Sequence, residues 1–139
     1  MSLHHTLIRK AHFSCGHKYE NLNWSDQKNI EVFGPCYSEF GHGHNYFVEF
    51  HINAPVCPDT GMTINLTDAD AVIAKVVNQV DHKHLNFDLE YFKTVVPTTE
   101  NIAQFLFENS QQEFELFNAS LKKVVLYEDE NLWVECSER

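Results

Sequence analysis

Two histidines at alternate positions, His42 and His44, have the spacing that most directly suggests chemistry in this chain. In a β-strand, residues i and i+2 project on the same side, so two imidazoles placed in this way can bind one ion. Gly43 adds no side chain between them, and His17 is expected at the end of an earlier strand that pairs with theirs. Three neutral imidazoles with an open fourth position are typical of catalytic zinc. Taken alone, a His-x-His pair is a weak motif that also occurs on surfaces.

The cysteines give a second constraint. None of the four forms a C-x-x-C pair, which argues against a structural zinc knuckle. The chain starts without the cationic segment and apolar run of a secretory signal, so we expect reduced thiols in the cytoplasm rather than a disulfide framework. The four are Cys15, Cys36, Cys57 and Cys136.

The net charge bears on which partners the chain can bind, and its length bears on the number of domains. Asp and Glu number 20 against 10 Lys and Arg, which gives a net charge of −10. This balance disfavours nucleic acid and anionic membranes, because both bind basic faces. No stretch approaches the ~20 apolar residues of a membrane helix. We expect residues 1–139 to form one domain, since the length and the 43% hydrophobic content suit a single core.

The elements that would position the histidines follow from periodicity. Residues 6–14 and 45–53 alternate apolar and polar side chains, as half-buried strands do. Between them, residues 18–43 are polar and rich in Asn, Ser and Gly, which predicts a long loop. A loop of that length in a compact domain is usually functional.

Two helices are expected next. One begins near Asp68 with Thr67 as N-cap, and another follows Pro97 with Thr98 or Thr99 as N-cap. Each has an apolar stripe at helical spacing. The predicted buried residues are Val72, Ile73, Val76, Val77 and Val80 in the first helix, and Ile102, Phe105, Leu106, Phe114 and Phe117 in the second.

Residues 121–128 and 132–137 read as two final strands around a short turn. The order of strand pair, helix pair and strand pair predicts an α+β fold, with an antiparallel sheet and helices packed on one face. Four strands leave two open edges, which favours closure of several sheets into an oligomer.

Several motifs in order resemble the 6-pyruvoyltetrahydropterin synthase and 6-carboxytetrahydropterin synthase family. They are FSCGH at 13–17, HGHNY at 42–46, TGM at 60–62, NLTD at 65–68, DHKHLN at 81–86 and PTTEN at 97–101, with SD at 25–26 and VFG at 32–34. The resemblance implies a tunnelling fold, in which a four-stranded antiparallel sheet carries two helices on one face. It also implies a barrel of three subunits, a homohexamer built as a dimer of trimers, and active sites between subunits. The implied cofactor is zinc, and the implied substrate is the pterin 7,8-dihydroneopterin triphosphate.

The resemblance also implies roles for single residues. Cys36 matches the catalytic thiol, a general base that Asp81 and His82 assist, and Glu128 matches the carboxylate that anchors the pterin by two parallel hydrogen bonds. Each also has a plainer interpretation: Cys36 as a packing cysteine, and Asp81 with His82 as a polar cluster at a helix end. Three residues that match the wall of the pterin pocket, Thr98, Thr99 and Glu100, also form an ordinary helix start.

The product of the reaction stays open at this point. Glu39 has the spacing of a glutamate that replaces the cysteine in relatives that cleave the side chain to 6-hydroxymethyldihydropterin for folate synthesis, yet Cys36 is also present. Glu39 is equally readable as a loop charge. Queuosine-pathway relatives tend to have three residues between the cysteine and the histidine pair, and this chain has five, which favours the pyruvoyl product. A non-catalytic pterin-binding member is the remaining alternative.

Overall fold

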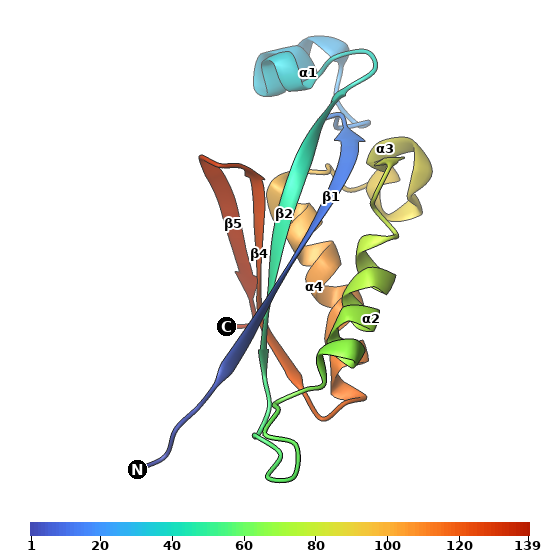
Figure 1. The fold of residues 1–139 in the computed structure, drawn as a ribbon. Helices are drawn as coiled ribbons and strands as arrows, with labels where there is room; N and C mark the ends of the chain where they lie inside the picture. Colours follow the sequence, from blue (N-terminus) through green and yellow to red (C-terminus); the bar gives the residue numbers. More distant parts are fainter.

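The computed structural model describes residues 1–139, and its centre is one sheet in the order β3-β1-β2-β4-β5 (Figure 1). Strand β1 (Thr6–His17) pairs antiparallel with β2 (His42–Asn53) along its full length. Strand β2 pairs with β4 (Ser120–Asp129), and β4 with β5 (Leu132–Ser137), both antiparallel. The four predicted strands are therefore all present.

The fifth strand was not predicted. Strand β3 (Lys83–His84) adds to the free edge of β1 in parallel and is only two residues long. A strand this short has no period to detect in a sequence. The expected α+β class is confirmed, but the sheet has five strands and one parallel pair.

Helices α2 (Leu66–Val77) and α4 (Thr99–Glu115) lie side by side on one face of the sheet (Figure 1). The side chains of β2 that face them, from Tyr46 to Ile52 at alternate positions, are completely buried. The predicted apolar stripes of both helices are buried as well, except that Phe117 lies beyond the end of α4 and is 40% exposed. The buried hydrophobic residues between sheet and helices form one continuous cluster.

The caps of these helices place their first turns. Of the two predicted N-caps of α4, Thr98 is the one used, and its side chain accepts a hydrogen bond from the Asn101 N–H. For α2, Thr67 was the wrong choice, because Asn65 is the N-cap and accepts from the Thr67 N–H. Asn and Thr both suit an N-cap, and the chain uses the earlier of the two.

The stretch predicted as a loop contains helix α1 (Asp26–Phe33) and the 3-10 turn η1 (Gly34–Cys36). Figure 1 shows α1 beyond the ends of β1 and β2, away from the helical layer. Helix α3 (Leu85–Asp88) and the 3-10 turn η2 (Glu90–Lys93) follow β3. These short elements surround the end of the sheet at which His17 and His42 pair.

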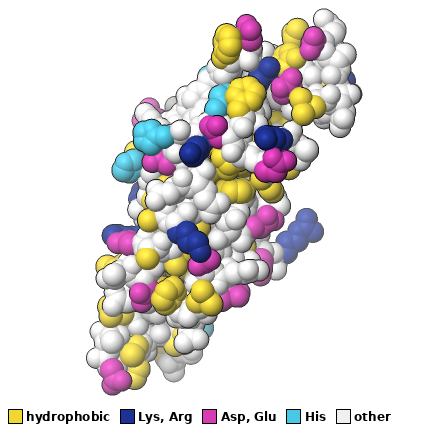
Figure 2. All heavy atoms as spheres, turned by 90° about the vertical axis from the view of Figure 1, so that its right-hand side faces the viewer, with side chains coloured by type: hydrophobic (Ala, Val, Ile, Leu, Met, Phe, Trp, Pro, Cys, Tyr) yellow, Lys and Arg dark blue, Asp and Glu magenta, His cyan; other side chains and the backbone are white.

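The outer face of the sheet has no helix over it (Figure 1). Three large hydrophobic side chains there, Ile8, Phe47 and Trp133, are each at least half exposed. On the face that Figure 2 shows, Lys and Arg side chains lie singly rather than in a continuous basic patch. No helix has both the length and the apolar character needed to cross a membrane.

Candidate metal centre and active site

Three histidines meet at one end of the sheet. His17 is the last residue of β1 and lies opposite His42, the first residue of β2, while His44 is two positions further along. One nitrogen from each ring lies within 4.8 Å of the others, and the Nε2 atoms of His17 and His42 are 3.1 Å apart. The predicted triad therefore forms, and strand pairing is the reason.

The environment of His17 suits a metal ligand. Its Nδ1 lies 2.8 Å from the carbonyl oxygen of Pro97. A carbonyl can only accept, so Nδ1 carries the proton and Nε2 keeps a free lone pair. Burial, together with the neighbouring His42 and His44, lowers the pKa of His17 to about 4. Burial likewise lowers the pKa of His42, so both imidazoles are neutral at pH 7, the form that binds metal.

The atom that most clearly fits a cation is Nε2 of His44. It is buried and has no hydrogen-bond partner. The nearest carboxylate oxygen, Oε1 of Glu128, is 3.4 Å away, and the same oxygen is 3.9 Å from Nε2 of His17. Buried polar atoms without a partner are costly. Three convergent imidazole nitrogens match the donor set of zinc, and an ion bound by them would satisfy this atom.

Two glycines allow the strands to approach at this point. A Cβ on Gly41, whose φ is +76°, would lie 2.3 Å from the carbonyl oxygen of His17. A Cβ on Gly43 would lie 3.0 Å from the carbonyl oxygen of Cys15. The glycine of the His-x-His motif is thus favoured by the close approach of the neighbouring β1 backbone.

A group of polar residues lies around Tyr19, next to the triad. Its ring meets that of His17 edge-on, with centroids 5.1 Å apart. Burial and neighbouring charges, those of Glu128, Cys36 and Glu100, raise the pKa of this tyrosine to about 12. Those three predicted site residues therefore share one neighbourhood. Thr99, which starts α4, is buried beside them, with its side chain next to the Tyr19 hydroxyl.

Cys36 and Glu39 lie on the segment that leads into β2. Cys36 ends η1, and its carbonyl oxygen accepts a hydrogen bond from the Tyr19 N–H at 3.0 Å. Glu39 is exposed. The next residue, Phe40, is fixed through its carbonyl oxygen, which accepts from Nε2 of His84 at 3.0 Å. Both predicted groups are thus on a segment held to the sheet by backbone hydrogen bonds.

Asp81 and His82 come directly before β3, at the edge of β1 along which β3 pairs. The Asp81 carboxylate accepts from the Ser14 N–H at 2.9 Å, and the His82 N–H donates to the Ser14 carbonyl at 2.7 Å. The His82 side chain is 85% exposed and its φ is +60°, which is uncommon for a residue other than glycine. It lines a hollow with Lys83 on the sheet edge. Within one chain, the only polar partners of these two side chains are the Ser14 N–H and each other.

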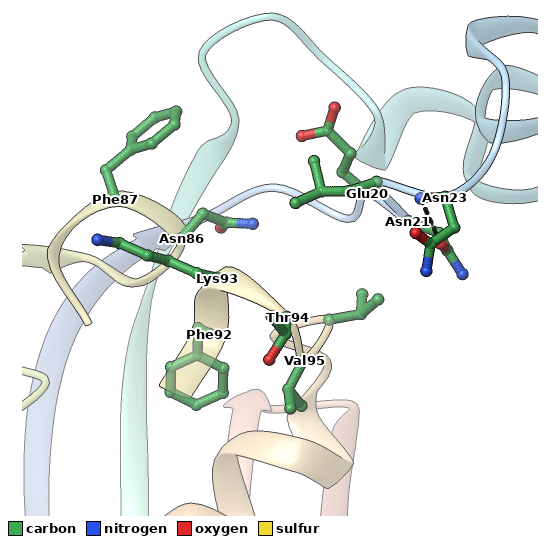
Figure 3. A pocket seen from close by; sticks show the side chains of 11 residues that line it. Glu20, Asn21, Asn23, Asn86, Phe87, Phe92, Lys93, Thr94 and Val95 are labelled. Carbon is green, nitrogen blue, oxygen red and sulfur yellow. Dashed lines mark hydrogen bonds between the residues drawn. The ribbon is translucent and has the colours of Figure 1, made fainter. Parts of the chain in front are cut away.

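A separate cleft of about 510 Å³ opens between residues 20–23 and 86–96 (Figure 3). None of the predicted site residues lines it. Its amide side chains already serve the fold, because Asn86 bonds both backbone groups of Lys18 and Asn21 accepts from the Asn23 N–H. The candidate site is therefore the histidine end of the sheet.

Comparison with known proteins identifies the family of the chain. The sequence profile described as 6-pyruvoyl tetrahydropterin synthase matches residues 6–139. The chain belongs to that family. It is 43% identical to the 6-pyruvoyl tetrahydrobiopterin synthase of Poecilia reticulata over 104 residues, which cover 74% of this chain and 71% of the relative. It is 38% identical to the Homo sapiens protein of the same name over 124 residues, or 88% of this chain and 84% of the relative.

A solved member of the family has the same fold. The structure of Caenorhabditis elegans 6-pyruvoyl tetrahydropterin synthase superposes with a TM-score of 0.93 at 32% identity, covering 99% of this chain and 97% of that one. The predicted family is confirmed, and membership makes this chain an enzyme of the synthase type. The non-catalytic alternative is thereby set aside.

Sequence reasoning missed two residues that lie close to predicted site residues. Tyr19 is central to the group that includes Cys36 and Glu128, yet an isolated tyrosine in a polar stretch gives no signal. Cys15 is buried one residue before the Gly16-His17 end of β1, and burial together with the charge of Asp81 raises its pKa to about 12. Its place in the period of β1 could have identified it as a core residue.

Proposed function

We propose that this enzyme converts 7,8-dihydroneopterin triphosphate to 6-pyruvoyltetrahydropterin with release of triphosphate, using one zinc ion held by His17, His42 and His44. The observation that carries the proposal is the convergence of the three imidazoles, with the Glu128 carboxylate at their edge. The names of the relatives support the reaction. Zinc, when bound, supplies a Lewis acid that acidifies the substrate carbon next to the side-chain oxygens.

The residues of the chain then divide the remaining work. Glu128 accepts two parallel hydrogen bonds from the amino group and ring N–H of the pterin, which fixes its orientation. Thr99 and Glu100 line the pterin pocket beside it, and Thr98 holds the start of α4 that carries them. Cys36 takes the proton from carbon as a general base. Triphosphate leaves, and the side chain is rearranged by an internal redox step that needs no external reductant.

Asp81 and His82 assist the thiol in this proposal, and they do so from a neighbouring subunit. Their side chains support this, since within the chain the Asp81 carboxylate contacts only the Ser14 N–H and the His82 ring, and the His82 ring contacts only Asp81. The φ of +60° at His82 supports a functional role, because backbone strain is concentrated at functional sites. The assembly we propose is a homohexamer formed as a dimer of trimers.

Glu39 motivates a second product. It lies three residues after Cys36 and is exposed on the same segment, so it is available to a bound side chain. Abstraction of a proton from a hydroxyl rather than from carbon leads to carbon–carbon cleavage and 6-hydroxymethyldihydropterin. The 6-carboxytetrahydropterin reaction is less favoured by the five-residue spacing before His42. The expected cytoplasmic location and the absence of nucleic-acid and membrane partners stay predictions.

Product analysis with purified dihydroneopterin triphosphate tests the proposal. We expect 6-pyruvoyltetrahydropterin as the main product, and a loss of roughly 100-fold or more in Cys36→Ala at unchanged zinc content. Any 6-hydroxymethyldihydropterin should disappear selectively in Glu39→Ala. A wild-type reaction that yields only 6-carboxytetrahydropterin, or no product with a full complement of zinc, would overturn the proposed function.

A further inference from the structure

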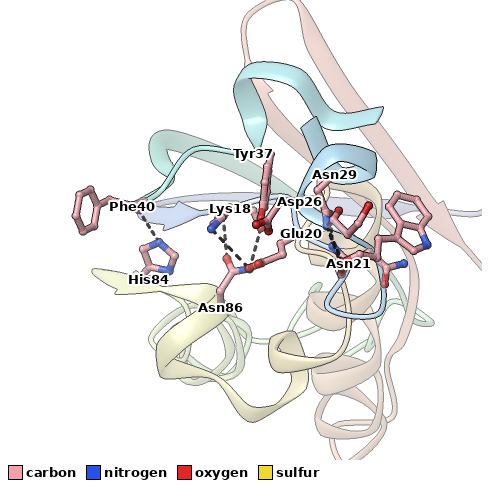
Figure 4. A network of polar contacts seen from close by, with 11 residues as sticks. Lys18, Glu20, Asn21, Asp26, Asn29, Tyr37, Phe40, His84 and Asn86 are labelled. Atoms are coloured by element: carbon pink, nitrogen blue, oxygen red, sulfur yellow. Dashed lines mark hydrogen bonds and ion pairs between the residues drawn. The ribbon is translucent and has the colours of Figure 1, made fainter. Parts of the chain in front are cut away.

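Two short segments cross beside the candidate thiol. The Tyr19 N–H donates to the Cys36 carbonyl at 3.0 Å. The residue before Tyr19 and the residue after Cys36 are also in contact: the Lys18 ammonium lies 4.7 Å from the centroid of the Tyr37 ring. The Tyr37 hydroxyl then donates to Oδ1 of Asp26 at 2.7 Å (Figure 4). The residue after Cys36, Tyr37, is therefore held by two contacts: Lys18 lies over its ring, and Asp26 accepts from its hydroxyl.

The two residues that hold Tyr37, Lys18 and Asp26, are themselves fixed by hydrogen bonds or by their place in a helix. The backbone N–H and carbonyl of Lys18 each bond to the side chain of Asn86, at 2.8 Å, so Lys18 is fixed to α3. Asp26 stands in the first turn of α1. The buried side chain of Asn29 ties that turn to residue 21 through hydrogen bonds of 2.8 and 3.1 Å. Figure 4 shows Tyr37 between the two anchors.

The turn is stiff at its centre, where the ring of Pro35 fixes φ, but not at its start. It begins at Gly34, where φ is +55° and a Cβ would meet no neighbouring atom within 4 Å, so other side chains do not confine it. Its internal backbone bond runs from the Tyr37 N–H to the Gly34 carbonyl. Glycine freedom at the start of the turn therefore leaves the orientation of the thiol dependent on contacts outside the turn.

We propose that Tyr37, held between Lys18 and Asp26, is a positioning residue that fixes the Cys36 thiol relative to the triad through residues 17–19. This inference rests on the proposed function, in which Cys36 is the base. A base must stand within hydrogen-bond reach of its proton, and displacement by about 1 Å can cost on the order of 100-fold in rate. The hydrogen bond to Asp26 also raises the pKa of Tyr37, which keeps the hydroxyl a donor.

Breaking the hydroxyl–carboxylate bond from either end tests the inference. We expect Tyr37→Phe and Asp26→Ala to lower kcat by about three- to tenfold with KM and zinc content unchanged. Asp26→Asn, which keeps an acceptor oxygen, should restore most of kcat. The matched control is Asp68→Ala, which also removes an acid from the first turn of a helix but has no tyrosine partner. Unchanged kcat in both Tyr37→Phe and Asp26→Ala would overturn the inference.

A double-mutant comparison separates positioning from general damage. If Tyr37 acts through the thiol, Tyr37→Phe has no further effect on the residual rate of Cys36→Ala. An equal fold-loss in both backgrounds would show that Tyr37 acts elsewhere and would overturn the inference.

An activity-independent measurement separates this inference from the proposed function. Mass mapping of iodoacetamide-treated protein should show Cys36 alkylated at least about twofold faster in Tyr37→Phe than in wild type, because a loosened turn opens more often. The rate at Cys57, far along the chain in another loop, should not change. If wild-type protein lacks the synthase reaction but Cys36 is still alkylated faster in Tyr37→Phe, the positioning role of Tyr37 stands and only the proposed function is wrong. Equal alkylation rates of Cys36 in the two proteins would overturn the inference that Tyr37 holds the Cys36 turn in place.

Discussion

At the scale of single residues, the histidine triad makes the clearest prediction. Wild-type protein should hold about one zinc per subunit. His42→Ala and His44→Ala should each lose most of it, because two imidazoles bind zinc far more weakly than three. Atomic-emission analysis with circular dichroism measures metal and fold together. His12→Ala is the control, since His12 lies exposed on the same strand pair outside the triad. Full zinc content in both triad variants would refute the site.

The cysteines differ in a way that alkylation can resolve. Burial raises the pKa of Cys15 to about 12, so it stays a shielded thiol. Hydrogen bonds from Thr60, through side chain and backbone, and from the Asp59 backbone lower the pKa of Cys57. At pH 8 we expect Cys57 to react at least about 100-fold faster than Cys15, and its rate to fall as the pH drops through the lowered pKa.

Peptide mapping after timed iodoacetamide treatment measures both rates in one sample. Unfolding in guanidinium is the control, since it should make the two thiols react alike. Comparable rates in the folded protein would contradict the buried position of Cys15.

The sequence predicted the triad because its geometry follows from local rules. A strand places His42 and His44 on one side, and pairing brings the end of β1 to them. Tyr19 was not predictable in this way, since its neighbours Cys36 and Glu128 are 17 and 109 positions away and meet only in the folded sheet. Roles that rest on resemblance, such as those of Asp81 and His82, stay predictions.

At the scale of elements, the long strands and the two core helices were predictable and the short elements were not. Helix α1 has eight residues and only Asn29 buried, so it carries no apolar stripe. Its signals are a Ser25 N-cap and Asp26 in the first turn, which also occur in turns. It is stabilised by polar tertiary bonds from Asn29 and Tyr37 rather than by core burial. Such bonds depend on residues that the local sequence does not contain.

The segment before β2 approaches the end of β1 closely at Gly41, which predicts a large loss of stability when Gly41 is replaced. Gly41 and Gly61 both have positive φ, but only at Gly41 would a Cβ meet the backbone of His17, whereas nothing lies within 4 Å at Gly61. Gly61→Ala should cost about 1 kcal/mol from φ strain alone. Gly41→Ala should cost roughly 3 kcal/mol or more, because β1 must move, and zinc affinity should fall with it.

Urea unfolding of the two variants, with and without added zinc, measures this difference. Equal losses of unfolding free energy would mean that the segment before β2 relaxes without displacing the end of β1. A normal zinc affinity in Gly41→Ala would lead to the same conclusion.

At the scale of the whole molecule, only one face of the sheet is covered by helices. The helical layer covers the inner face, while Ile8, Phe47 and Trp133 are exposed on the outer face. Strand β5 is an open edge, and the upper part of β1 is covered only by the two residues of β3. Open edges and an apolar face are features that assembly removes. His82 lies at this β1 edge, so the proposed assembly and the proposed chemistry would involve the same edge of the sheet.

Complementation between two inactive variants tests the shared site. If Cys36 of one subunit works with His82 of its neighbour, Cys36→Ala and His82→Ala are each nearly inactive alone. Refolding them together at equal ratio should restore about one quarter of wild-type activity, because half of the sites keep the thiol and half of those receive an intact imidazole. A mixture of Cys36→Ala with Cys36→Ser is the control and should recover nothing. Light scattering should show a hexamer in every sample. Mixed hexamers without recovered activity would place the complete site within one chain and refute the shared site.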